Sequence, residues 1–192
     1  MNKELLSLYQ ADKRERVNQP QGNTPEYKAM RARDGQRRRR VIELAAANGL
    51  DTAEDYYHAA HILNHGDTPD DAEHAHRFAL RSSELGYRPA RWLAAASYDR
   101  WQMYQGKPQK YGTNYVFDGQ KDRLWDVDPN TTDAERAEWD IPPLAEQLRK
   151  AEEANRQKTP MSEEDLKQFE ANAPEWLQSA LKKWHAAPKD TE

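Results

Sequence analysis

The sequence predicts a mostly helical protein: an array of antiparallel helical hairpins with one irregular loop or small β-hairpin insert at about residues 107–130. Helix-start signals and glycine stops recur at similar spacing, and the helical period disappears after Gly106. Although 32% of the 192 residues are charged, six Trp and nine Tyr accompany well-patterned apolar segments. We therefore expect a folded protein, not a disordered chain.

The N-terminal segment is expected to form two helices, residues 2–14 and residues 25–48. The first places several apolar side chains on one side. The second begins with the capping hydroxyl of Thr24 followed by a proline, and it ends at a glycine, Gly49. Both features are typical of helix termini.

Three further helices of similar length follow, at residues 51–65, 69–86 and 89–105. Each ends near a glycine and is joined to the next by a short turn. Ala53 and Ala90, near the starts of two of these helices, lie about 37 residues apart, a period that suggests Sel1-type or tetratricopeptide-like repeats. The sequence thus indicates an array of helical hairpins.

The segment after Gly106 is expected to contain a small hairpin. Residues 113–117 and 123–127 flank Asp118-Gly119, a favourable hairpin turn. Thr132, followed three residues later by a glutamate, has the form of a capping box and predicts a return to helix.

The C-terminal third predicts a boundary between a core and an extension. One helix is expected from about Pro143 to Lys158, and Ser162 begins a pair of short helices. We therefore expect a helical core domain over residues 1–158. Residues 159–192 are expected to form a helical extension that packs on this core or is partly flexible.

Composition excludes several classes of function. The chain has no cysteine, so disulfides and thiol chemistry are excluded, and no segment is apolar and long enough for a signal peptide or a membrane span. With a net charge of −4, no global field favours nucleic acid. We expect a cytoplasmic protein with no nucleic-acid or membrane partner. The basic run Arg37–Arg40 suits a helix surface or internal salt bridges, with a phosphate or nucleic-acid patch as the alternative.

Three histidines of the 51–65 helix, His58, His61 and His65, fall on one face, opposite an apolar stripe. Because imidazole is a common ligand of zinc, copper and nickel, they are a candidate metal site. No acid is interleaved among them, so the pattern favours solvated or structural histidines, with a metal-free binding or catalytic site and then a metal site as the alternatives. We expect no metal and no other cofactor.

In the 89–105 helix, Asp99 and Arg100 fall on the two margins of the apolar sector. Charges in such positions are unfavourable unless they are paired or hydrogen-bonded, so both are expected to have partners in the fold. They either tie this helix to the following loop or form an acid–base pair that faces a ligand.

The loop at residues 106–115 combines neutral hydrogen-bonding groups with aromatic rings. Gly112 permits a turn or a close backbone approach. The other candidate residues of the loop are Gln109, Tyr111, Thr113 and Asn114. This mixture suits a polar small molecule or a peptide backbone, and it equally suits attachment of the loop to a helical core.

Six short segments in a fixed order support a family resemblance. They are Tyr9–Arg16, Asp55–Gly66, Asp99-Arg100, Lys107–Thr113, Thr132–Arg136 and Ile141–Leu144. Over about residues 5–150, the set resembles a bacterial family known as domain of unknown function 6624.

The resemblance implies two more site residues and supports a third already named. An acid and an arginine in the family's first helix correspond to Asp12 and Arg16, and a histidine before a glycine corresponds to His65. The chain has Asn64 and Asn114 where the family pattern has glutamine, which keeps the amide and shortens its reach. The resemblance therefore favours His65 among the three histidines, and it implies no particular reaction.

Two functions follow from these residues. The leading hypothesis is a helical binding module for a small polar molecule or a peptide, with a cleft lined by His65, Asp99, Arg100 and the loop. The alternative is a metal-free acid–base enzyme in which His65 exchanges a proton, Asp99 orients it and Arg100 holds an anionic group. The sequence leaves both open.

Overall fold

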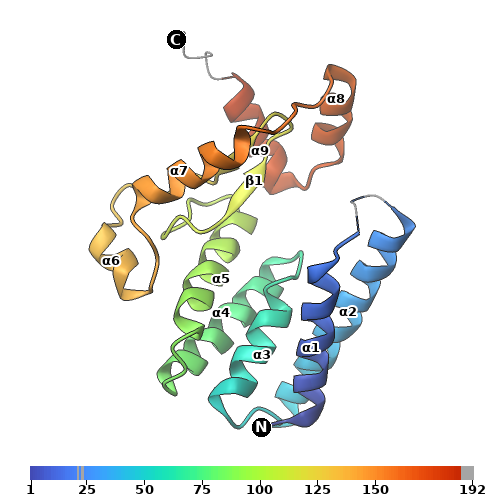
Figure 1. Cartoon of the computed structure of the whole chain (residues 1–192), viewed down its shortest axis with the longest axis vertical. Helices are drawn as coiled ribbons and strands as arrows, with labels where there is room; N and C mark the ends of the chain where they lie inside the picture. Colours follow the sequence, from blue (N-terminus) through green and yellow to red (C-terminus); the bar gives the residue numbers. More distant parts are fainter. Residues whose placement is uncertain (21, 23, 187–192) are drawn as a thin grey trace. The chain divides into compact units, whose positions relative to one another are not determined.

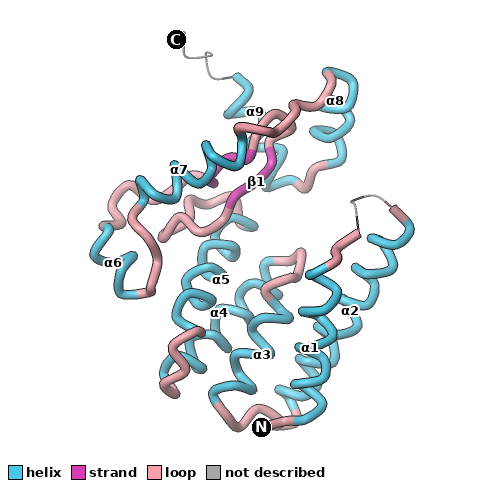
Figure 2. The backbone as a smooth tube through the Cα atoms, in the orientation of Figure 1, coloured by secondary structure: helices cyan, strands magenta, loops and turns pink. Residues whose placement is uncertain are grey.

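The computed structural model describes residues 1–20, 22 and 24–186 and is mostly helical, with a small two-stranded antiparallel sheet (Figure 1, Figure 2). The predicted fold class is confirmed. Within the described residues, no helix has the length and apolar character needed to cross a membrane. The chain divides into two compact units, Met1–Tyr98 and the residues from Asp99 onward.

The first unit is a set of packed helices. In each neighbouring pair from α1 to α4 the two helices are in contact, and α1 also contacts α3 (Figure 1). Helices α1 to α4 begin at Asn2, Thr24, Thr52 and Thr68, whose side chains each accept a hydrogen bond from the N–H three residues further on. The helices are α1 (Lys3–Val17), α2 (Pro25–Ala46), α3 (Ala53–Leu63), α4 (Pro69–Glu84) and the first part of α5 (Ala90–Tyr104).

The apolar core of this unit lies where α1, α2, α3 and α4 meet. Its buried members are Leu5, Val41, Leu44, Leu50, Ala59, Ile62, Leu63 and Ala75. Both long faces of α3 are therefore covered, because α4 packs on one side and α1 on the other. The face of α3 that was predicted to be polar consequently meets α1. The repeat character of the array stays a prediction.

The basic run of α2 takes part in salt bridges within the unit. Arg37 is 8% exposed, and its neighbours in the run reach acids on other helices. The pairs are Arg37 with Glu15 and Asp34, Arg38 with Asp71, and Arg40 with Glu4 and Glu43. The interpretation as internal salt bridges is confirmed for these three arginines.

Asp55 joins the start of α3 to the start of α1. Its fully buried carboxylate accepts hydrogen bonds from the N–H groups of Asn2 at 2.7 Å, Thr52 at 3.1 Å and Asp51 at 3.3 Å. Burial alone raises the pKa of Asp55, but these N–H donors bring it below its ordinary value of 3.8.

Asp55→Asn is expected to lower the free energy of unfolding near neutral pH by about 1–3 kcal/mol, because the amide cannot accept all three hydrogen bonds. The folded pKa of Asp55 lies below the unfolded value. Its contribution is therefore present above 3.8 and is lost as the pH falls through the folded pKa. Urea denaturation in acidic buffers should show the gap between wild type and variant closing at low pH. A gap independent of pH contradicts this role, and Asp70→Asn, an exposed acid of α4, is the control.

The second unit contains the hairpin and the C-terminal helices. Strands β1 (Tyr115–Phe117) and β2 (Asp122–Leu124) pair antiparallel, as predicted, with Val116 opposite Arg123. The helices that follow are α6 (Asp133–Glu138), α7 (Leu144–Asn155), α8 (Glu163–Asn172) and α9 (Glu175–Ala186).

The division of the chain differs from the predicted boundary near residue 158. Trp125, directly after β2, packs with Met103 of α5 and with three residues of α9 in one apolar cluster. Those three residues are Leu177, Leu181 and Trp184. The C-terminal helices therefore share a core with the hairpin region. Residues 187–192 of the predicted extension lie outside the described residues.

Candidate functional site

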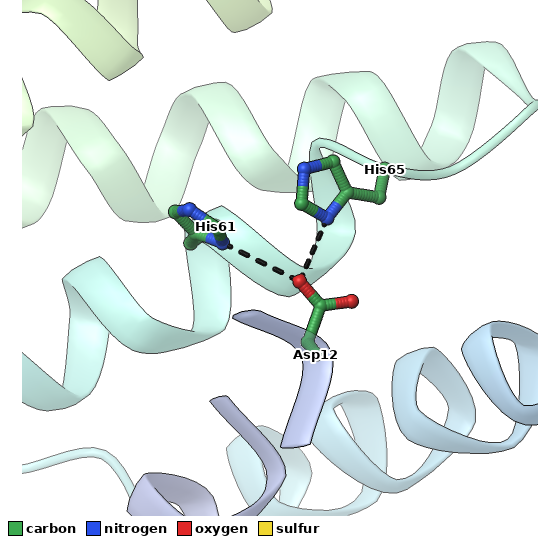
Figure 3. A group of neighbouring side chains, drawn as sticks. All are labelled: Asp12, His61 and His65. Atoms are coloured by element: carbon green, nitrogen blue, oxygen red, sulfur yellow. Dashed lines mark hydrogen bonds and ion pairs between the residues drawn. The ribbon is translucent and has the colours of Figure 1, made fainter. Parts of the chain in front are cut away.

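Asp12, His61 and His65 come together in the first unit, from α1, from the last turn of α3 and from the turn after it (Figure 3). Oδ2 of Asp12 lies 2.8 Å from Nδ1 of His65 and 3.6 Å from Nδ1 of His61. The Asp12 side chain is 1% exposed, whereas each imidazole is 24% exposed. One buried carboxylate oxygen thus faces two partly exposed imidazoles.

Helical periodicity explains why these side chains meet. Asp12 lies seven residues, or about two turns, after Leu5 and shares its buried face of α1. His61 and His65 are four residues apart, so they project toward the same side at the end of α3. Contact between α1 and α3 then brings the acid against both histidines.

Asp34 of α2 provides a second buried carboxylate in the same region. It is 1% exposed and accepts hydrogen bonds from Arg16 at 2.5 Å, from Arg31 at 2.7 Å and from Arg37. Nη2 of Arg16 and Nε of Arg37 lie 3.8 Å and 3.7 Å from Oδ1 of Asp12. Arginines therefore stand between the two carboxylates.

The turn that contains His65 is held by two of these arginines. Nη1 of Arg31 donates to the carbonyl oxygen of His65 at 3.0 Å. Nε of Arg16 lies 3.4 Å from Nδ1 of His65, a longer contact than the one that this nitrogen makes with Asp12. The shorter contact places the ring proton on Nδ1, where it is donated to the carboxylate.

The protonation states follow from burial and from these contacts. Burial raises the pKa of Asp12, but its contacts with His61 and His65 and nearby positive charge bring it well below its usual range. Burial lowers the pKa of His65, and the contact with Asp12 opposes this only in part. Near neutral pH the pair is a carboxylate and a neutral imidazole.

His58 is not part of this group. It is buried, and its ring stacks on Tyr9 with centroids 4.2 Å apart and an interplanar angle of 24°. Burial also lowers the pKa of His58. The three predicted metal ligands therefore do not assemble as a set, because Asp12 stands beside His61 and His65 where the sequence suggested His58.

In the second unit, Asp99 holds the loop that follows α5. Its fully buried carboxylate accepts hydrogen bonds from the N–H groups of Lys110 at 2.7 Å, Tyr111 at 2.9 Å and Thr113 at 3.0 Å, and from the Thr113 hydroxyl at 2.8 Å. Burial raises the pKa of Asp99, against the effect of these donors. Both carboxylate oxygens are engaged by the loop, so Asp99 forms the structural tie, which is one of the two roles that its marginal position suggested.

Gln109 and Asn114 close the same loop. The Gln109 side chain donates to the carbonyls of Asn114 at 3.1 Å and Trp125 at 2.8 Å, and it accepts from the N–H of Asn114 at 2.9 Å. Nε of Arg100 donates to Oδ1 of Asn114 at 3.1 Å. Both margin residues of α5 thus have partners, as expected.

Tyr111 and Gly112 form the turn of this loop. Tyr111 is buried, and its carbonyl accepts a hydrogen bond from Nε of Arg136 at 3.0 Å. Gly112 follows a bend at residues 110–111 and has a φ of 85°, in the left-handed region that favours glycine, so its expected conformational freedom is used.

The predicted site residues fall into two groups. Asp12, Arg16 and His65 meet in the first unit, while Asp99, Arg100 and the loop residues meet in the second. Asp34 was not among the candidates. The buried residues of α2 are Met30, Asp34, Arg37, Val41 and Leu44, an apolar stripe interrupted by charge. Two charged residues, Asp34 and Arg37, within an otherwise apolar stripe are the sequence pattern that could have identified Asp34 as a candidate.

Comparison with known proteins gives no match: no protein-family model, no curated protein and no solved structure is similar to the chain. The resemblance to domain of unknown function 6624 therefore stays a prediction. Function has to be inferred from the geometry of the side chains.

Proposed function

We propose that this chain binds a small polar molecule at the charged side chains of its first unit, which we call the polar cluster. The observation that supports this proposal is the contrast in exposure within the cluster. Asp12 and Asp34 are each 1% exposed, while four side chains next to them, Arg16, Arg31, His61 and His65, are 20–24% exposed. The polar cluster consists of Asp12, Arg16, Arg31, Asp34, His61 and His65.

Stability alone is a weak reason for such a cluster. Buried ion pairs often stabilise a fold no better than well-packed apolar side chains of similar volume. Here two carboxylates interrupt the apolar faces of α1 and α2, next to a core built from leucine, isoleucine and valine. Convergent polar groups beside an apolar core are typical of small-molecule sites.

The chemistry of the cluster defines the kind of molecule. Its partly exposed members include two guanidiniums, which donate hydrogen bonds to oxygen acceptors, and two imidazoles. With its ring proton directed at Asp12, His65 offers Nε2 as an acceptor. We therefore expect a ligand with a carboxylate or carbonyl oxygen, which also includes a peptide terminus.

A second candidate function is acid–base catalysis by His65, favoured by its 2.8 Å contact with Asp12. Asp12 takes the orienting role that the sequence assigned to Asp99, whose oxygens are occupied by the loop. With the ring proton on Nδ1, Nε2 of His65 is the atom that exchanges a proton with a bound molecule. NMR of the imidazole nitrogens should find the Nδ1–H tautomer in metal-free protein, and the Nε2–H tautomer contradicts this candidate.

The binding proposal is tested by NMR of the full chain after treatment with EDTA. Acetate, succinate and N-acetylglycine amide are the probes, and at least one is expected to shift the backbone signals of residues 61–66. His65→Gln should weaken that binding by more than about tenfold, equivalent to about 1.4 kcal/mol.

The matched control is His74→Gln, a histidine of α4 whose Nδ1 contacts the carbonyl of Asp70. This variant should bind the probes as wild type does. Shifts confined to the second unit, or an affinity unchanged by His65→Gln, would contradict the proposal.

A further inference from the structure

We propose that Asp12, His61 and His65 bind a divalent transition-metal ion, with zinc as the reference ion, and leave a coordination position open. The inference rests on the proposed function, since its three residues belong to the polar cluster. The metal ion would be the group that binds the oxygen of the proposed small molecule. It revises the expectation of no cofactor, and it replaces His58 by Asp12 in the ligand set suggested by the sequence.

The ligand atoms are close to the spacing that a metal requires. Asp12, His61 and His65 each offer one possible ligand atom, and these atoms all lie within 4.8 Å of one another (Figure 3). In a tetrahedral site with bonds of about 2.0–2.1 Å, neighbouring ligand atoms are about 3.3 Å apart. The distances of 2.8 Å and 3.6 Å from Asp12 to the two histidines lie on either side of this value.

Two atoms of the group lack the hydrogen bonds that burial normally requires. Nδ1 of His61 and Oδ1 of Asp12 are buried and have no hydrogen-bond partner among the described residues. Asp12 is 1% exposed, so solvent does not satisfy its carboxylate. A metal bound at Oδ2 of Asp12 would supply the partner that Nδ1 of His61 lacks, while Oδ1 stays beside Arg16 and Arg37 at 3.8 Å and 3.7 Å.

Metal binding would replace the contact between Asp12 and His65. A metal needs an ionised carboxylate and an imidazole lone pair. Oδ2 of Asp12 and Nδ1 of His65, now 2.8 Å apart, would each turn to the metal. On binding, the ring proton of His65 leaves Nδ1 and Nε2 takes one up, so the imidazole stays neutral and no net proton is released.

The surrounding charge is compatible with a cation. Arg16 and Arg37, the guanidiniums next to Asp12, are both paired with Asp34, and Arg37 is also paired with Glu15. Arg31 shares the same Asp34 carboxylate, so these ion pairs offset much of the arginine charge without cancelling it. Among the three ligands, the carboxylate of Asp12 carries the negative charge. A set of two imidazoles and one carboxylate suits zinc, cobalt or nickel, and three protein ligands leave a position for water or for an oxygen of the bound molecule.

The test uses the full chain, freed of metal with EDTA, and titrates it with cobalt(II) chloride and then with zinc chloride, without any organic ligand. We expect one equivalent of cobalt to give the intense visible absorption of a tetrahedral site and zinc to displace it. Zinc should also convert His65 from the Nδ1–H to the Nε2–H tautomer in imidazole NMR. His61→Gln should weaken binding by more than about tenfold, because loss of an outer-sphere partner alone costs about 10–100-fold.

Two control variants separate this site from the alternatives. His74→Gln should leave binding unchanged. His58→Gln should also leave it unchanged, whereas a loss equal to that of His61→Gln would assign the site to the three histidines and overturn the proposal. Folding of each variant is verified by circular dichroism.

Absence of stoichiometric cobalt binding by folded wild type, or binding unaffected by both His61→Gln and His65→Gln, also overturns the proposal. The two proposals fail separately. The binding proposal is tested on EDTA-treated protein, so its result does not depend on metal. The metal proposal is tested without any organic probe, so its result does not depend on probe binding.

Discussion

Asp99→Asn is expected to lower the free energy of unfolding of the second unit by about 3–5 kcal/mol. The carboxylate of Asp99 is fully buried and accepts four hydrogen bonds from Lys110, Tyr111 and Thr113. Asparagine offers one acceptor oxygen, and its NH₂ group would face N–H donors that keep no acceptor. Each buried donor left in this way costs about 1–3 kcal/mol.

Tryptophan fluorescence during urea denaturation measures this effect, because five of the six tryptophans lie in the second unit. Glu138→Gln, an exposed acid of α6, is the control with the same change of charge. A difference of less than about 0.5 kcal/mol between Asp99→Asn and wild type, the range of ordinary surface substitutions, contradicts the assigned role.

Asp34→Asn is expected to destabilise the first unit by a similar amount, about 3–5 kcal/mol. The carboxylate accepts hydrogen bonds from Arg16, Arg31 and Arg37, and the side chain is 1% exposed. A neutral amide leaves three guanidiniums close together without the charge that balances them.

Amide hydrogen exchange is the appropriate measurement here, because it reports the opening of α1, α2 and α3 separately from the second unit. Protection in these helices should fall together. Glu43→Gln, an exposed acid of the same helix paired with Arg40, should change stability by about 0–1 kcal/mol. Protection in Asp34→Asn equal to that in Glu43→Gln contradicts the prediction.

The helices were predictable because their signals are local. Thr24 caps the helix that it was expected to begin, and the helices expected from residues 51 and 69 start at Ala53 and Pro69. Gly112 has a positive φ, which favours glycine. The partners of Asp99 and Arg100 were also foreseen, since a charge at the edge of an apolar face needs a hydrogen bond wherever the chain provides one.

The candidate site was less predictable because it depends on which helices meet. Periodicity placed His58 with His61 and His65, but it does not show that α1 covers this face of α3. That contact buries His58 against Tyr9 and inserts Asp12 beside the other two histidines. The domain boundary was hard to predict for the same reason, because it depends on where α9 packs. Leu181 and Trp184 of α9 lie in one apolar cluster with Trp125.

Anomalous diffraction is the most direct test of a binding site at Asp12, His61 and His65. Crystals of the full chain, soaked in zinc chloride, should show a peak at the zinc absorption edge within about 2.3 Å of Oδ2 of Asp12 and of Nδ1 of both histidines. A non-protein oxygen should occupy the remaining position. Zinc bound only elsewhere, with the 2.8 Å contact between Asp12 and His65 still in place, would contradict the site.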